Sequence, residues 1–180
     1  DDNPGPVAAV LRFTPDSGRA GIETRVRIDQ YTTVRAIAQT SDGALHMASR
    51  FVKASGGCSA PPAADARAAR ATLGRMRLRM QPGDAPGAPV AALLTISHPN
   101  DSGLVMDQST RLYTPPHFVR SVAVRYGDRP VLDAELDFAI SENPHLRFHF
   151  LPQGGPGELR VEVVDSQDRR FEHAVTWPAP

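Results

Sequence analysis

Apolar and polar residues alternate along short segments of this chain, and turn residues separate the segments. In residues 22–28, every second residue from Ile22 to Ile28 is apolar or threonine, and the residues between them are charged. A period of two residues predicts a half-buried β-strand. Ser41-Asp42-Gly43 fits a hairpin turn between two further strands. The other strands predicted in this part cover residues 7–14, 33–40 and 44–54.

Seven further short strands are predicted between residues 75 and 177. Such a series of turn-separated strands is typical of an immunoglobulin-like β-sandwich. The Cys-Trp-Cys core of antibody domains is missing, because the chain has a single cysteine. We therefore expect the sandwich architecture alone, with a long polar connection over residues 99–116. The seven predicted strands cover residues 75–80, 90–97, 118–126, 131–140, 145–151, 159–164 and 171–177.

An alanine-rich segment between these two groups of strands predicts the one helix of the chain, over residues 61–73. It begins with two prolines and is followed by Gly74, as helix termini favour. Its alanine face is too small to form a core, so we expect a helical linker. The predicted organisation is a β domain over residues 1–60, the linker, and a β-sandwich over residues 74–180.

The four strands of the first domain are few for an independent sandwich. A half-sheet of this kind leaves an apolar face and strand edges uncovered. We therefore expect an all-β protein whose first domain lacks its N-terminal strands. Those strands could be cleaved, disordered or on another polypeptide.

Charge and composition exclude several classes of function. The chain has 20 basic and 20 acidic residues, so it lacks the positive excess typical of nucleic-acid or membrane-surface binding. No apolar run is long enough to span a bilayer, and no membrane insertion is expected. No nucleotide-binding loop, metalloprotease helix or paired-cysteine motif occurs, so no cofactor is expected. The sequence starts at Asp1 without a leader peptide, which is compatible with earlier removal of one.

Cys58 is the only thiol, and it follows Gly56 and Gly57 at the end of a predicted strand. A lone cysteine is often a small buried apolar residue, but its sequence neighbours are too small to bury it. The start of the predicted helix close by would lower the pKa of the thiol. Gly56 and Gly57 would make the segment Gly56-Gly57-Cys58, named here the arm, flexible. We therefore expect an exposed, reactive thiol that can form disulfide-linked dimers. No base lies near it in the sequence, which argues against a thiol enzyme.

Two histidines, His98 and His117, flank the long polar connection beside prolines. Either could bond to the loop backbone or face a partner, so both roles remain open. His145 and His149 share the polar face of one predicted strand, where solvent is the simpler environment. Copper or zinc bound by Cys58 and histidines is chemically conceivable, but the spacing offers no support for it. We therefore predict no metal site.

Three segments of the C-terminal part, residues 96–104, 116–119 and 143–150, together resemble SoxZ of the bacterial sulfur-oxidising system. In the N-terminal part, Asn3-Pro4, residues 24–28, Asp42-Gly43 and the strand running into Ser55-Gly56-Gly57-Cys58 resemble the later half of SoxY. The combination is similar to fused SoxYZ-like carriers associated with quinoprotein dehydrogenases.

This resemblance implies a periplasmic carrier with two immunoglobulin-like domains, not an enzyme. The arm cysteine, Cys58, would hold a sulfur substrate as a covalent adduct while partner enzymes act on it. The implied partners are periplasmic Sox-type enzymes, or a quinoprotein dehydrogenase and cytochrome components. His98 and His117 match the SoxZ pattern and are expected at fold or interface positions. SoxY ends at its arm, whereas this chain continues at Ser59, so the arm is tethered at both ends.

The alternative hypothesis is a non-covalent binding or assembly module. Such a module would deliver a ligand or metal to a periplasmic dehydrogenase, with Cys58 incidental. A thiol enzyme is a third and weaker hypothesis.

Overall fold

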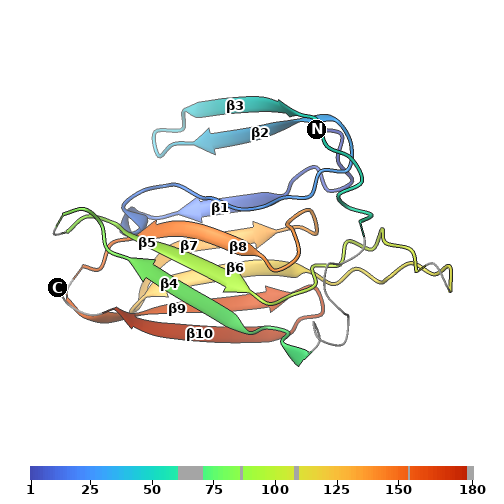
Figure 1. The fold of residues 1–180 in the computed structure, drawn as a ribbon. Helices are drawn as coiled ribbons and strands as arrows, with labels where there is room; N and C mark the ends of the chain where they lie inside the picture. Colours follow the sequence, from blue (N-terminus) through green and yellow to red (C-terminus); the bar gives the residue numbers. More distant parts are fainter. Residues whose placement is uncertain (61–70, 86, 108–109, 154, 178–180) are drawn as a thin grey trace.

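A computed structural model describes residues 1–60, 71–85, 87–107, 110–153 and 155–177 of the chain (Figure 1). The prediction of an all-β protein is confirmed, because the described elements are ten strands and one short 3-10 helix, η1. These elements are β1 (Ala9–Phe13), η1 (Pro15–Ser17), β2 (Thr32–Gln39), β3 (Leu45–Val52), β4 (Met76–Gln81), β5 (Val90–Ile96), β6 (Val119–Tyr126), β7 (Arg129–Leu136), β8 (His145–Phe150), β9 (Gly157–Asp165) and β10 (Arg170–Trp177).

Two antiparallel sheets form an immunoglobulin-like sandwich (Figure 1). One has the order β1-β7-β6-β9-β10 and the other has the order β4-β5-β8. All seven strands predicted between residues 75 and 177 are present. Side chains from alternate positions of both sheets fill the space between them, as the period of two requires. The largest fully buried ones include Phe148, Phe150, Leu94, Ile96, Leu132 and Leu159.

Strand β1 belongs to the larger sheet of this sandwich, although it lies far from the other strands in the sequence. It pairs antiparallel with β7, from Ala9 opposite Leu136 to Phe13 opposite Leu132. Leu11 and Phe13 pack against the core. The larger sheet therefore contains strands from both sides of the predicted linker, which was placed at residues 61–73. The division into two domains remains a prediction about the order of segments along the chain.

Strands β2 and β3 form a separate two-stranded sheet beside the sandwich (Figure 1). The predicted hairpin turn is confirmed, because Gly43 has a φ of 85° and its amide donates to the Thr40 carbonyl at 2.8 Å. Nearly every residue of both strands is exposed. The exposed apolar side chains include Ile37, Leu45, Met47 and Phe51.

Residues 22–28 do not form the regular strand that their alternation predicts. They make only isolated bridges, Glu23 to Arg147 of β8 and Val26 to Ile140 after β7. Because the segment passes from one partner element to another, no continuous ladder of hydrogen bonds can form. The helix predicted over residues 61–73 falls largely outside the described residues and stays a prediction.

Hydrogen exchange can test whether β1 folds as part of the sandwich. We expect the amides of β1 bonded to β7 to open only with β6 and β9, because they belong to one sheet. Amides of β2 and β3 should exchange faster, by roughly 100-fold or more, since a two-stranded sheet with exposed faces opens locally. Native-state exchange followed by NMR measures both groups. Exchange of β1 at the rate of the hairpin would show that it opens separately.

Candidate functional site

The segment Gly56-Gly57-Cys58 packs against the backbone of residues 28–29. The Gly56 amide donates to the Asp29 carbonyl at 2.7 Å, and the Gly57 amide donates to the Ile28 carbonyl at 2.9 Å. A Cβ at Gly57 would lie 2.6 Å from the Ile28 oxygen, and Gly56 has a φ of 71°. Glycine is therefore needed here for close approach and backbone geometry. The flexibility predicted for both glycines remains a prediction.

Cys58 is buried, with 1% of its surface exposed. Its amide donates to Asp29 Oδ1 at 3.3 Å, its carbonyl accepts from Ser102 Oγ at 2.5 Å, and its thiol contacts Asn3 Oδ1 at 3.9 Å. The expectation of an exposed thiol is wrong for this conformation. Its sequence neighbours are indeed small, but residues distant in the sequence surround it. A disulfide-linked dimer would require the thiol to leave this position first.

Electrostatics also hold the Cys58 thiol in its protonated form. Burial raises the pKa of Cys58, and the negative charge of Asp29 raises it further. The contact with Asn3 and the positive charge of Arg27 oppose this shift but do not reverse it. The prediction of a lowered pKa is therefore wrong here. Since the thiolate is the nucleophile, the docked cysteine is poorly reactive.

Arg27 connects the N-terminal segment to the sandwich. One terminal nitrogen of its guanidinium donates to the Asn100 carbonyl and, at 3.1 Å each, to the carbonyls of Phe138 and Ile140. Burial lowers the pKa of Arg27. The charge on the neighbouring Cys58 is the largest effect in the opposite direction. The planar guanidinium has five N–H donors and can serve several carbonyls at once. Arg27 thus fixes the segment on which the arm rests.

The loop of residues 98–104, named here the docking loop, meets the arm from the other side. Its centre is Asn100, which is fully buried with a φ of 49°. Asn100 Nδ2 donates to the Ile140 carbonyl at 3.0 Å, and Asn100 Oδ1 accepts from the Val119 amide at 2.9 Å. Every polar group of the side chain is engaged, so the loop is held in one arrangement. It therefore presents Ser102 to the Cys58 carbonyl.

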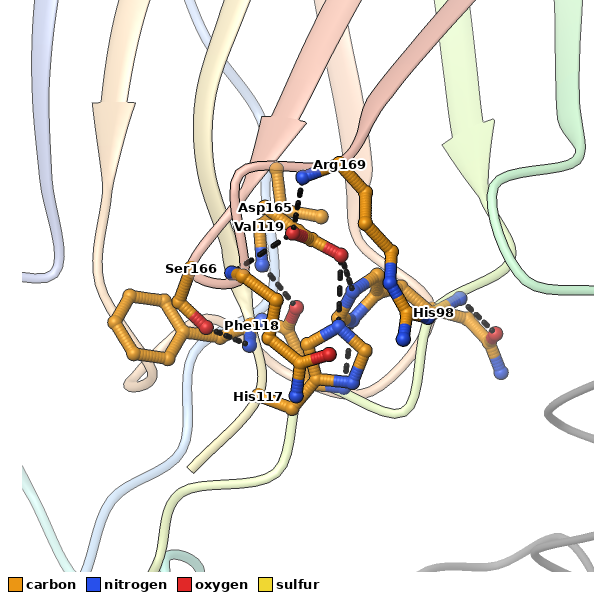
Figure 2. A network of polar contacts seen from close by, with 10 residues as sticks. His98, His117, Phe118, Val119, Asp165, Ser166 and Arg169 are labelled. Carbon is orange, nitrogen blue, oxygen red and sulfur yellow. Dashed lines mark hydrogen bonds and ion pairs between the residues drawn. The ribbon is translucent and has the colours of Figure 1, made fainter. Parts of the chain in front are cut away.

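Two histidines and a carboxylate meet at the start of the docking loop, whose first residue is His98 (Figure 2). His117 Nε2 is 2.7 Å from Asp165 Oδ2, and His98 Nε2 is 3.7 Å from the same oxygen. The His98 and His117 rings meet edge to face, with centroids 4.5 Å apart. His98 and Asp165 are fully buried, so neither contacts a partner directly in this conformation. The interface role predicted for His98 and His117 remains a prediction, whereas their part in supporting the docking loop is visible.

These three residues could be taken for a metal site, because one ligand atom from each lies within 4.8 Å of the others. The tautomer of His98 argues against it. His98 Nδ1 accepts a hydrogen bond from the Asn100 amide at 3.0 Å, so the neutral ring carries its proton on Nε2. A metal-binding nitrogen needs a free lone pair, and the other ring nitrogen usually donates. Among the described residues, His98 Nε2 has no hydrogen-bond partner and faces Asp165 Oδ2 at 3.7 Å, whereas His117 bonds to that oxygen directly. Because the His98 nitrogen that faces Asp165 carries a proton, the cluster fits electrostatic pairing with the carboxylate better than a metal centre.

The same geometry explains the titration of the cluster. Burial, followed by the positive charge that His117 can carry, lowers the pKa of His98 to about 4. Burial alone would raise the pKa of Asp165. Hydrogen bonds from His117 and from the amides of Arg169 and Gln167 outweigh it, and the pKa is lowered. Asp165 is therefore a stable negative charge beside a neutral His98.

Sequence reasoning identified Cys58 but missed the residues that enclose it. Asn3, Arg27 and Ser102 all lie inside the segments quoted above for their family resemblance. That position was the available signal. The bonds to Cys58 were not predictable, because Asn3 and Ser102 lie 55 and 44 residues away from it in the sequence, and Asp29, which also bonds to it, lies 29 residues away.

Two family models match the chain. The model of the sulphur oxidation protein SoxZ matches residues 77–176, and that of the sulfur oxidation protein SoxY matches residues 1–58. Cys58 is the last residue of the SoxY match. No curated protein matches the chain. Within the described residues, no helix has the length and apolar character needed to cross a membrane.

Gly57→Ala should release the arm, because the new Cβ cannot occupy the space beside the Ile28 carbonyl. We expect alkylation of Cys58 by iodoacetamide to accelerate on the order of tenfold, corresponding to a loss of about 1.4 kcal/mol of docking free energy. Intact mass measured over time gives the rate. Gly21→Ala is the matched control, since neither Gly57 nor Gly21 has a positive φ and a Cβ added at Gly21 meets only the Arg19 side chain, at 3.8 Å. Equal rates in both variants would contradict the docked arrangement.

Stability should depend on pH through His98. Its folded pKa of about 4 lies below the ordinary value of 6.5, so the unfolded state binds more protons between these values. The free energy of unfolding should therefore fall as the pH drops from 6.5 to 4, by about 3 kcal/mol from this residue. Urea unfolding at several pH values measures the slope. His98→Gln should flatten it in this window, and an unchanged slope would contradict the assignment.

Proposed function

The chain belongs to the SoxZ family and carries a SoxY segment ahead of it in the same polypeptide, and from this premise we propose that it is a covalent carrier in sulfur oxidation. Cys58 is the attachment point, and the site of action is the periplasm. The position of the only cysteine supports this proposal above all, because it ends the SoxY match and lies against the docking loop of the SoxZ part. Periplasmic Sox-type enzymes are the proposed partners.

The attachment step is a nucleophilic attack by the Cys58 thiolate on a sulfur atom. With tetrathionate, an S–S bond forms to Cys58, the S–S bond of the reagent breaks, and thiosulfate leaves with the electron pair. The thiol proton passes to water, and no further oxidant is needed. With thiosulfate itself, joining it to the thiol releases two electrons. A cytochrome partner is the proposed acceptor of those electrons.

Such a carrier must have two states of the arm. In the docked state, the thiol is buried and its raised pKa keeps it protonated. Undocking breaks four hydrogen bonds of the arm backbone, at Gly56, Gly57, the Cys58 amide and the Cys58 carbonyl, and the contact of the thiol with Asn3 Oδ1. Each of these hydrogen bonds is worth about 0.5–1.5 kcal/mol net, so a partner's binding energy can shift the balance. The partner therefore selects when Cys58 reacts.

One observation favours a second candidate function. The buried, protonated thiol is also what an incidental cysteine would show. In that case the protein is a non-covalent binding or assembly module for a periplasmic quinoprotein dehydrogenase and its cytochrome components. A thiol enzyme is disfavoured, because the described contacts of Cys58 with Asn3, Asp29 and Ser102 supply no histidine of the kind that activates cysteine nucleophiles.

Tetrathionate treatment tests attachment. We expect intact mass to show one thiosulfate group per wild-type chain, removed by a reducing agent, and none on Cys58→Ser. Gly57→Ala should take up the group faster than wild type, because its arm is released. An adduct that persists in Cys58→Ser would contradict attachment at this residue.

A reconstituted reaction tests the carrier role beyond simple thiol reactivity. A sulfur-oxidising enzyme mixture depleted of its own SoxYZ should resume thiosulfate-dependent cytochrome reduction when wild-type chain is added. Cys58→Ser combined with Ser59→Cys keeps one thiol but moves it by one position, and it should restore little activity. Equal activity from Cys58→Ser alone would favour the non-covalent module.

A further inference from the structure

The outer face of the three-stranded sheet carries positive charge in a chain whose net charge is zero. The strand register places three residues from each strand on this face. Its rows are Arg77–Thr95–His145, Arg79–Leu93–Arg147 and Gln81–Ala91–His149. None of these nine residues is acidic. Glu23 alone borders the face among the bridged neighbours, and it is 3.5 Å from Arg147.

Three arginines line a groove on this face: Arg77 and Arg79 of β4, and Arg75, which directly precedes this strand. Arg75, Arg77 and Arg79 are exposed, and none of them takes part in the ion pairs found among the described residues. The groove has a volume of about 480 Å³, and the hydroxyl groups of Thr95 and Ser97 also line it. Guanidinium groups with free donors suit carboxylates, which they bind in a bidentate manner.

His149 of β8 provides a second observation on this face. His149 Nδ1 is buried without a hydrogen-bond partner among the described residues. Burial lowers the pKa of His149, and the positive charges of Arg19 and Arg147 lower it further. His149 is therefore uncharged at neutral pH, and the positive charge of this face comes from its arginines, Arg77, Arg79 and Arg147.

Charged side chains on an edge strand can serve simply to prevent aggregation. That role would account for Arg77 and Arg79 on β4, an edge strand of this sheet. The same role would account for Arg147 on β8, the other edge strand, but it does not account for the groove lined by Thr95 and Ser97. The middle strand, β5, contributes Ala91, Leu93 and Thr95 to this face, and their side chains are shorter than arginine. An approaching chain could therefore reach the arginines on both sides.

We propose that this basic face is the docking surface for an acidic segment of the partner protein that acts at Cys58. The inference rests on the proposed carrier function. Its location supports it, because Ser97 lines the groove and directly precedes the docking loop, whose Ser102 donates to the Cys58 carbonyl. A partner seated here would have its reactive site beside the arm. Opposite charge would then steer the encounter, and salt would weaken it.

The test uses an eight-residue glutamate peptide as the probe and the full-length chain labelled with ¹⁵N. At low ionic strength, the peptide should shift amide resonances of β4, β5 and β8. Arg77→Glu combined with Arg79→Glu should weaken its binding at least tenfold. The matched control is Arg160→Glu combined with Arg170→Glu, which changes the net charge equally on β9 and β10. The control should weaken binding less than threefold.

Three results would overturn the proposal: no binding, shifts confined to other surfaces, or equal loss in both double variants. Shifts produced equally by inorganic sulfate would reduce the site to a small-anion site. Tighter binding to phosphatidylglycerol vesicles or to single-stranded DNA would replace the protein partner by another class. Tetrathionate labelling of Cys58 is measured on the same variants and should be unchanged. Weaker peptide binding with unchanged labelling of Cys58 therefore separates this inference from the carrier function.

Discussion

The buried polar network around Asn100 is the constraint on which the arm site depends. Its side chain bonds to the backbone at Ile140 and Val119, its amide donates to His98, and its carbonyl accepts from Arg27. An unsatisfied buried polar group costs about 1–3 kcal/mol. Any other arrangement of the docking loop would leave several such groups without partners. The loop therefore has one strongly preferred shape, and the N-terminal segment is bonded to it directly.

This network makes the accessibility of Cys58 a property of the whole sandwich. Asp165, at the end of β9, holds His117 and lies beside His98. His98 supports Asn100, and Arg27 connects Asn100 to the segment under the arm. The thiol is thus several contacts away from β9, yet each contact fixes the next. A change in the histidine cluster would displace the docking loop and thereby weaken the contacts that hold the arm.

The sequence predicted the elements well, and the contacts between distant segments poorly. Every strand of the sandwich was predicted, some from alternation and the others as short segments between turn residues. Alternation is informative because burial of one strand face imposes a period of two. The same alternation in residues 22–28 indicated an extended backbone correctly, but periodicity does not reveal whether a neighbouring strand is available for pairing. Burial of Cys58 was also hidden, because its neighbours Gly57 and Ser59 are small. The atoms that cover it come from segments far away in the sequence.

Burial of the thiol is compatible with a carrier if docking is the resting state. A swinging tail with a low-pKa thiol would react with any suitable sulfur compound it met. A Cys58 thiol whose pKa is raised by burial and by Asp29 stays protonated until the arm leaves its site. Gly57 also has a role in the docked arrangement, since it permits close contact with the Ile28 backbone. Because the chain continues on both sides of Cys58, we propose that the arm moves as a short loop that lifts away from residues 28–29.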